Sequence, residues 1–169
     1  MELKIKGRVV WVFGDHFDVD LIVGVRNIRE TNPEKLARLC MADFDADFAQ
    51  KVRAGDVVVA GRNFGYGHPH PQAMIALRRL GIAAVIAESF APPFFRSELA
   101  SGSVLLPCPG ITAKVSHGDE IEVDVAGGII LNLTSGETIP LPSLSPNILD
   151  MMALGGQVPY LRKKLAASS

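Results

Sequence analysis

Two kinds of hydrophobic pattern divide the chain into a first and a second half. In the first half the apolar runs are short and continuous, at 57–60 and 82–87, which is typical of parallel strands buried on both faces. In the second half apolar and polar residues alternate at 120–125 and around 129–133, as in strands with one exposed face. A period of two also predicts a strand over 3–13. Its expected buried face holds Leu3, Ile5, Val9, Trp11 and Phe13.

Helical patterns lie between and after these strands. The strongest covers 71–80, where apolar residues recur at i, i+3, i+4 and i+7 and Gly81 follows as a stop. Asn32 and Ser89 precede two other helical patterns, and we expect both to act as N-caps. The predicted helices are 33–40, a weaker one at 45–51, 71–80, 91–100, and one that starts at Ser145–Pro146 and stops at Gly155–Gly156. The tail at 160–164 is expected to end a surface helix.

The order of these elements predicts an α/β fold. Strands at 57–60, 82–87 and 104–106 alternate with helices, which gives a parallel β-α-β-α-β core with right-handed crossovers. Gly127–Gly128 and Ser135–Gly136 separate the later strands, which indicates an additional antiparallel β-rich part. No linker or internal repeat interrupts the pattern, so we expect residues 1–169 to form a single domain.

The amino-acid composition argues against nucleic acid and membranes as binding partners. The 169 residues are 48% hydrophobic and 21% charged, as in ordinary globular chains. A net charge of −1 offers no basic surface to nucleic acid or to an anionic membrane, and no apolar segment approaches the roughly 20 residues that span a bilayer. The N-terminal segment lacks the apolar core of a signal peptide, and Cys40 and Cys108, which lack metal-motif spacing, are expected to be free core thiols. These features predict a cytoplasmic protein.

The loop that joins strand 57–60 to helix 71–80 carries the candidate chemistry. It contains three glycines and two histidines and leads directly into the helix. Such a junction points backbone N–H groups at the helix N-terminus, where the dipole favours an anion, so we expect a substrate that bears a carboxylate. A second polar segment holds Asp15, Asp18 and Asp20. It is either a cation site or a solvated turn in which the carboxylates cap backbone amides.

Two motifs carry a resemblance to a known family. The loop has the pattern Gly–x–Asn–Phe–Gly–x–Gly over 61–67, and the next strand continues as Ala–Val–Ile–Ala–x–Ser–Phe–Ala over 84–91. With these motifs the chain resembles the small subunit of isopropylmalate isomerase, the swivel domain of the aconitase-like hydro-lyases. The resemblance covers nearly the whole length. It implies a layered β/β/α swivelling domain that acts with a large subunit carrying a [4Fe–4S] cluster and is inactive alone. This chain itself would bind no cofactor, because a cluster takes three or four thiolates.

The chain departs from the family at the chemically critical point. After Gly67 the family has Ser–Ser–Arg–Glu–His, where the second serine serves as the base and the arginine binds carboxylate. Here residues 68–72 read His–Pro–His–Pro–Gln. Pro69 therefore stands where the family has the catalytic serine, and its side chain has no basic group. His70 stands in place of the arginine and is a weaker, pH-dependent partner for a carboxylate. A family arginine is also missing at Pro92.

Three interpretations of His68 and His70 follow. One imidazole could replace the serine as general base, since its reference pKa of about 6.5 suits proton abstraction near neutral pH. The two could instead form a metal site completed by His16 or His117. In the third interpretation they cap the helix or face solvent.

The resemblance also implies substrate-binding residues and partners. Arg26 and Arg62 would face the cleft between the subunits and hold a carboxylate, with surface ion pairs as the alternative. By the same resemblance, Asn63, Gly65 and Gly67 would form the substrate-facing turn. The leading hypothesis is a hydro-lyase small subunit that dehydrates and rehydrates a hydroxy di- or tricarboxylate with an iron–sulfur large subunit. The alternative is a divergent binding or regulatory module without catalysis, which could form a homo-oligomer.

Overall fold

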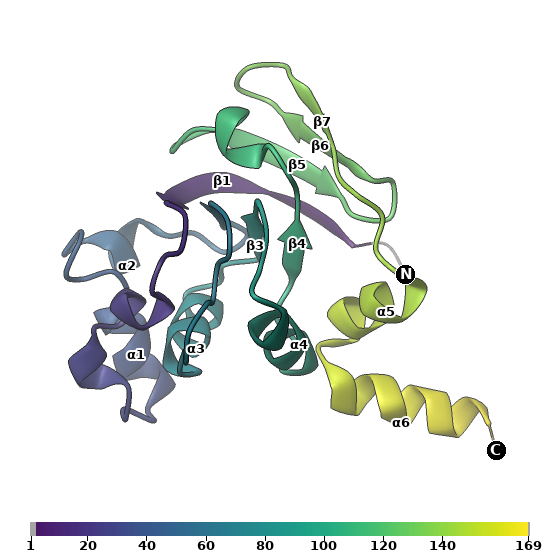
Figure 1. Cartoon of the computed structure of the whole chain (residues 1–169), viewed down its shortest axis with the longest axis horizontal. Coiled ribbons are helices and arrows are strands. Elements are labelled where there is room, and N and C mark those ends of the chain that lie inside the picture. Colours follow the sequence, from purple (N-terminus) through teal and green to yellow (C-terminus); the bar gives the residue numbers. More distant parts are fainter. Residues whose placement is uncertain (1–2, 169) are drawn as a thin grey trace.

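The fold is built on one curled sheet with strands of both orientations. A computed structural model describes residues 3–168, and within them the sheet has seven strands in the order β4-β3-β2-β1-β5-β6-β7 (Figure 1). The strands are β1 (Lys4–Phe13), β2 (Val57–Ala60), β3 (Ala84–Ala87), β4 (Leu105–Pro107), β5 (Glu120–Asp124), β6 (Ile129–Asn132) and β7 (Thr138–Pro140). The pairs among β1 to β4 are parallel, and the pairs from β1 through β5, β6 and β7 are antiparallel. The predicted parallel core and antiparallel part are both confirmed.

Strand β1 is the element that both halves share. Its first half, Lys4–Arg8, pairs with β5, and its second half, from Val9 to Phe13, pairs with β2. The register shifts between Val9 and Trp11. This shift makes the predicted alternation wrong in the middle of the strand, because Val10 is buried and Trp11 is only partly so.

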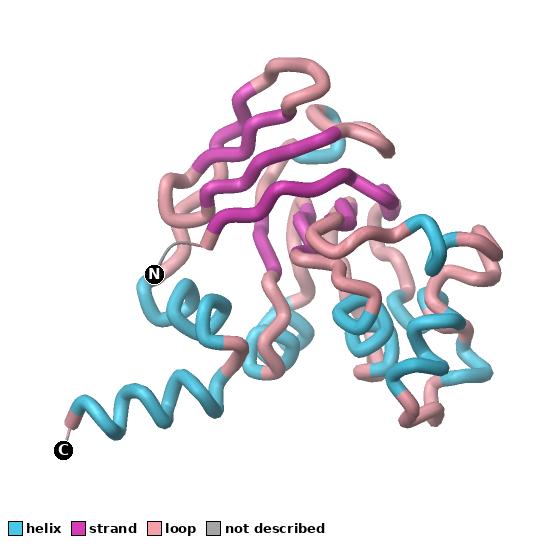
Figure 2. Tube along the Cα trace, turned by 180° about the vertical axis from the view of Figure 1, so that it is seen from behind, coloured by secondary structure: helices cyan, strands magenta, loops and turns pink. Residues whose placement is uncertain are grey.

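Helices cover the parallel half of the sheet. Figure 1 shows most of them below the strands, with α2 beside the strands at the left, and Figure 2 shows the same arrangement from behind, with the antiparallel strands at the opposite end. The helices are α1 (Pro33–Leu39), α2 (Phe48–Lys51), α3 (Gln72–Arg79), α4 (Pro92–Ala100), α5 (Pro146–Leu154) and α6 (Gln157–Ala167), with 3-10 turns η1 (Val19–Ile22), η2 (Val25–Asn27) and η3 (Ile111–Ala113). None of the helices in the described residues combines the length and the apolar character that a bilayer span needs.

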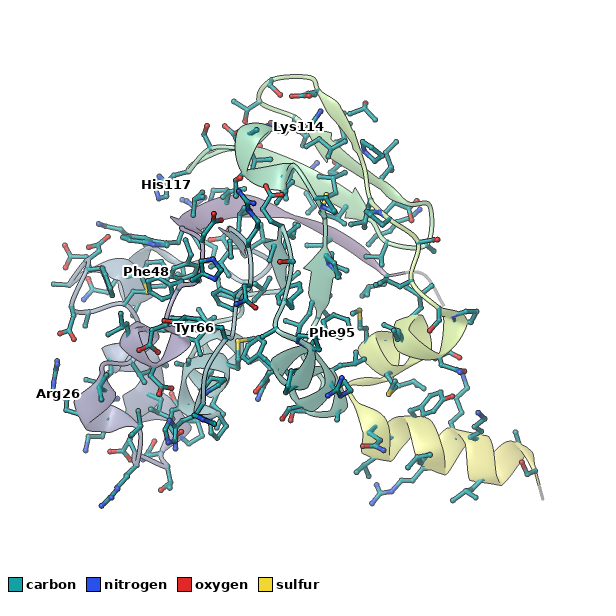
Figure 3. All side chains as sticks on the ribbon, viewed as in Figure 1. Arg26, Phe48, Tyr66, Phe95, Lys114 and His117 are labelled. Carbon is teal, nitrogen blue, oxygen red and sulfur yellow. The ribbon has the colours of Figure 1, made fainter. Side chains whose placement is uncertain are left out.

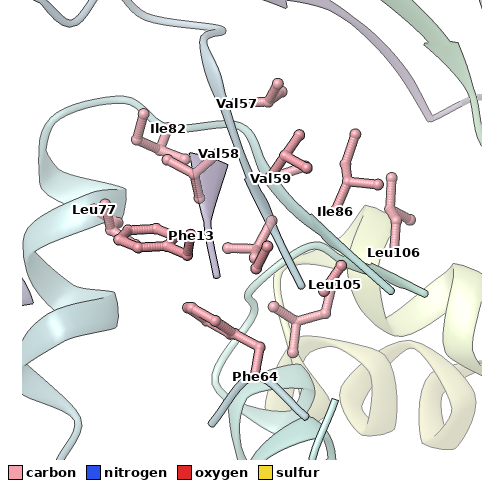
Figure 4. Close-up of a cluster of buried hydrophobic side chains, with 14 of the residues drawn as sticks. Phe13, Val57, Val58, Val59, Phe64, Leu77, Ile82, Ile86, Leu105 and Leu106 are labelled. Atoms are coloured by element: carbon pink, nitrogen blue, oxygen red, sulfur yellow. The ribbon is translucent and has the colours of Figure 1, made fainter. Parts of the chain in front are cut away.

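Much of the core lies between the parallel strands and these helices, and it extends to Ile121, Ile130 and Ile139 of the antiparallel strands. All residues of β2 and β3 are buried, which explains why their sequences are continuously apolar. Figure 4 shows Phe13, Phe64 and Leu77 packing toward Val58 and Val59 at the centre. Phe64 belongs to the glycine-rich loop, so the base of that loop is part of the core.

Of the two helix N-caps predicted from the sequence, the structure confirms one and contradicts the other. The side chain of Asn32 accepts the N–H groups of Glu34 and Lys35 and caps α1 as expected. The prediction for Ser89 is wrong. Helix α4 begins after Ala91 without a side-chain cap, because the Ser89 hydroxyl instead accepts the N–H of Asn63 at 2.8 Å. Beyond Gly155, the predicted stop, the tail forms the whole of α6.

Candidate active-site loop

The loop at 61–71 lines a cavity at the carboxyl end of β2. The cavity has a volume of about 860 Å³ and lies between the loop and the first turns of α4. Ligand sites typically measure about 300–1,000 Å³, so this space suits a small organic substrate. Five of the predicted site residues line it: Asn63, Gly65, Gly67, His68 and His70. The structure therefore brings together the loop residues on which the sequence-based prediction rests.

Backbone and side-chain bonds to the segment after β3 hold the loop in place. The N–H of Phe64 donates to the Ser89 carbonyl at 3.1 Å, and the Phe64 carbonyl accepts the N–H of Ala91 at 3.0 Å. The Ser89 hydroxyl adds the bond to Asn63. The Phe64 ring is fully buried, and its centroid lies 5.7 Å from that of Phe94 on α4. The loop is thus fixed at its base by groups distant in sequence.

Two glycines of the loop need their small size for different reasons. Gly65 and Gly67 both have positive φ, +85° and +79°, in the left-handed region that favours glycine. A Cβ at Gly65 would also overlap the Phe94 ring, whereas a Cβ at Gly67 would meet nothing within 4 Å. Gly65 therefore permits close packing on α4, while Gly67 provides only the turn.

His70 has a partner on a separate segment. Oδ1 of Asp20 accepts the backbone N–H of His70 at 2.8 Å, and Oδ2 lies 2.8 Å from Nδ1 of the ring. The His70 side chain is 46% exposed and that of Asp20 only 13%. His68, by contrast, is exposed and has no hydrogen-bond or ion-pair partner among residues 3–168. The two loop histidines are thus held very differently.

A third imidazole lies beside the loop. Nδ1 of His16 is 3.2 Å from the Asn63 amide nitrogen, and its ring packs edge-on against Tyr66 at 6.0 Å. His16 and Asn63 both have positive φ, +52° and +56°, which is uncommon for residues with a Cβ and costs free energy. Figure 3 shows Tyr66 near the middle of the molecule, above the helices. Sequence reasoning named His16 only as a metal ligand and missed Tyr66.

The buried carboxylate of Glu98 forms part of the cavity wall on α4. It accepts the Ser103 hydroxyl at 2.9 Å and an Arg78 guanidinium N–H at 3.1 Å. Glu98 is 6% exposed, so these bonds compensate the cost of burying its charge. No local pattern predicts this group, because its three members come from separate segments of the chain.

The two predicted arginines do not line the cavity. Arg26 forms a bidentate pair with Asp43 at 2.7 and 3.0 Å, and Figure 3 places Arg26 at the outer edge of the helices. Its hydrogen bonds lower the pKa of the Asp43 carboxyl. Nε of Arg62 lies 3.5 Å from Oδ2 of Asp15, with the Arg62 side chain 75% exposed. In this chain both arginines form surface ion pairs, the alternative considered from the sequence.

Neither of the two metal sites considered from the sequence has a set of ligands in the described residues. Among the residues that the structure describes, no three His, Cys, Asp or Glu side chains gather to hold a metal ion. The carboxylates of Asp15, Asp18 and Asp20 instead accept backbone N–H groups, as the solvated-turn interpretation predicted. His117 packs against Trp11, with ring centroids 6.5 Å apart, away from the cavity.

Both cysteines belong to the core, as expected. Cys40 is 1% and Cys108 0% exposed, and neither forms a disulfide. Burial raises the pKa of Cys40 to about 12, and burial with the nearby Glu88 carboxylate raises that of Cys108 to about 11. Neither thiol is placed to act at the cavity.

We compared the chain with known protein families to identify the class that has this fold and this glycine-rich loop. Residues 24–108 match the family model of the aconitase C-terminal domain. The isopropylmalate/citramalate isomerase small subunit of Methanocaldococcus jannaschii is 44% identical over 99% of both chains. The 2,3-dimethylmalate dehydratase small subunit of Eubacterium barkeri is 39% identical over 94% of this chain and 97% of its own.

A solved structure agrees with these relatives. The crystal structure of 3-isopropylmalate dehydratase from Methanocaldococcus jannaschii superimposes with a TM-score of 0.87 at 38% identity, covering 98% of each chain. The chain therefore belongs to the family of 3-isopropylmalate dehydratase small subunits, within the aconitase-type hydro-lyases.

Proposed function

We propose that this chain is the small subunit of a hydro-lyase that dehydrates and rehydrates a hydroxy dicarboxylate, with His68 and His70 supplying the proton transfer. The observation that carries the proposal is the cavity in which both imidazoles lie beside the glycine turn and Asn63. Removal of a proton next to a carboxylate needs a base that accepts protons near neutral pH, and imidazole is suited to that task. Pro69 has no side-chain base, so the adjacent histidines are the candidates.

The relatives support a substrate class. Their names refer to isopropylmalate, citramalate and 2,3-dimethylmalate, which are malates with alkyl substituents. In such a substrate two carboxylates flank the carbons that lose hydroxyl and hydrogen. Asn63 and the glycine turn line the cavity next to the N-terminus of α3, and in this proposal their N–H groups hold one carboxylate.

The rest of the active centre comes from a large subunit that carries a [4Fe–4S] cluster. Such a cluster, held by the large subunit, would supply Lewis-acid chemistry to the leaving hydroxyl. This chain does not fit as its holder, because it has two cysteines, both in the core, whereas a cluster takes three or four thiolates. Arg26 and Arg62 are then available to meet the large subunit or the substrate by exchanging their present partners. A chain of this kind is inactive alone and works in the cytoplasm.

The test is reconstitution. The chain is purified anaerobically with the large subunit of the same enzyme, and alkene absorbance is followed with malate-, citramalate- and citrate-like acids. We expect turnover only by the pair. His68→Ala and His70→Ala are compared with His117→Ala, which removes an imidazole outside the cavity. Loss of a general base costs about 10²- to 10⁴-fold in rate.

Two outcomes separate this proposal from its alternative. Turnover at the wild-type rate by the variant lacking both loop histidines would refute the histidine base. Failure of the chain to co-purify with a large subunit, together with absent turnover, would favour the binding or regulatory module.

A further inference from the structure

Asp20 contacts His70 with both carboxylate oxygens, across 50 residues of sequence. Oδ1 accepts the backbone N–H at 2.8 Å and Oδ2 lies 2.8 Å from the ring nitrogen Nδ1. One contact fixes the position of the residue, and the other fixes the orientation of its ring. The other ring nitrogen, Nε2, has no partner among the described residues, and His70 lines the cavity.

The chemistry of the pair determines where the ring carries its proton. An ionised carboxylate only accepts hydrogen bonds, so Nδ1 of His70 must be the donor. In the neutral imidazole the lone pair is then on Nε2. This is the arrangement in which an aspartate holds a catalytic histidine in the correct tautomer in hydrolase triads.

The support for Asp20 is rigid. The residue belongs to the 3-10 turn η1, whose first and last residues, Val19 and Ile22, are fully buried. The side chain of Asp18 caps this turn by accepting the N–H of Asp20 at 3.0 Å. Asp20 itself is mostly buried, so its carboxylate has little freedom to turn away from His70. His68 has no such support among the described residues, and neither of its tautomers is selected.

The charge of the pair argues against a carboxylate-binding role for His70. With the ring protonated, Asp20 and His70 together carry no net charge, and with the ring neutral they carry −1. Such a pair is a poor anchor for an anionic substrate, unlike the arginine that the family has at this place. Proton transfer is the role that remains for Nε2.

We propose that Asp20 is a positioning residue that holds His70 as the Nδ1–H tautomer, so that Nε2 of His70 is the proton acceptor of the dehydration. This rests on the proposed function. In the forward step Nε2 takes the proton from the carbon next to a carboxylate, and the C–H electron pair becomes the new C=C bond. The C–O bond breaks and its electron pair leaves with the hydroxyl. The proton taken by His70 and the departing hydroxide together make up the one water that is lost. Hydration reverses both transfers.

The first experiment measures the tautomer without any need for turnover. Ring ¹⁵N chemical shifts are recorded for the full chain at a pH where the imidazoles are neutral, and His70→Ala assigns the His70 signal among the four histidines. We expect Nδ1–H in the wild type. An Nε2–H tautomer there would overturn the proposal whether or not the reconstituted pair turns over.

Asp20→Asn sharpens this experiment. In the wild type, two N–H groups of His70 face two carboxylate oxygens of Asp20. The asparagine amide has only one oxygen to accept a hydrogen bond, and its NH₂ group is a donor. Because the backbone N–H of His70 cannot change, the amide oxygen satisfies it and the NH₂ group faces Nδ1. His70 should then shift to the Nε2–H tautomer, and an unchanged tautomer would contradict the proposal.

The second experiment measures turnover by the reconstituted enzyme. Asp20→Asn should lower kcat by about 10²- to 10⁴-fold and change KM by only a few-fold, as expected for a lost tautomer. Asp47→Asn makes the same chemical change at an exposed position and should leave kcat unchanged. A normal kcat for Asp20→Asn in an active pair would overturn the positioning role and leave the proposed function intact. An inactive wild-type pair would instead contradict the proposed function, while the NMR result still decides the tautomer.

Discussion

Replacing Gly65 by alanine should destabilise the chain more than the same change at Gly67, although both glycines have positive φ. Left-handed backbone costs a residue with a Cβ about 1–2 kcal/mol, and this cost applies to both positions. At Gly65 the new methyl group also overlaps the Phe94 ring, and such overpacking costs about 1–3 kcal/mol more. We therefore expect about 2–5 kcal/mol for Gly65→Ala and about 1–2 kcal/mol for Gly67→Ala.

Urea unfolding of the full chain measures both values. The two variants should keep the wild-type m value, because neither change alters the area exposed on unfolding. Phe94→Ala, made alone and in the Gly65→Ala background, completes a double-mutant cycle. We expect the two changes to couple by about 1–3 kcal/mol, since the second removes the group with which the first collides. Equal costs for the two glycine variants, with no coupling to Phe94, would refute the packing of the loop on α4.

Three further predictions concern the body of the fold. Cys40 and Cys108 should resist an aromatic disulfide reagent at pH 8 in the native chain and react in urea, because burial raises the pKa of both thiols; fast labelling of the native chain would contradict their burial. Burial raises the pKa of Asp56, but hydrogen bonds from Arg8 and from backbone N–H groups outweigh this and hold it below its usual value of about 3.9. The pair therefore contributes its full stabilisation above about pH 4, and this contribution is lost as the pH falls through the lower pKa of Asp56 in the folded state. We expect Asp56→Asn to cost about 2–4 kcal/mol of unfolding free energy at pH 7 and less in unfolding curves measured in acid. Asn132→Ala should cost about 2–4 kcal/mol in urea, because its buried amide binds Asp119 and the Lys114 carbonyl; a cost below about 0.5 kcal/mol would show that those partners find water.

Local signals predicted most of the elements. Asn32 caps α1 through its own neighbours, and the continuous runs at β2 and β3 follow from burial on both faces. Such features depend on a few adjacent residues, so they can be read from the chain directly. The register shift in β1 could not, because it arises where one strand changes partners from β5 to β2.

The candidate site was predictable only in part. The loop residues are adjacent in sequence, and their glycine spacing indicates a turn that faces a ligand. Their supports are distant in sequence: Ser89 holds Asn63 from 26 residues away, and Asp20 holds His70 from 50. The same limit applies to Arg26, whose pairing with Asp43 depends on how two loops meet. Residue type indicated the chemistry, but only the fold shows which carboxylate faces which base.

Turnover by the reconstituted pair of subunits, with His70→Ala in the small one, measures directly whether His70 takes the proton. We predict that the wild-type pair forms alkene from an alkyl-substituted malate, and that the variant pair assembles equally well but is about 10²- to 10⁴-fold slower. An assembled His70→Ala pair that turns over at the wild-type rate would contradict the assignment of His70 as the proton acceptor.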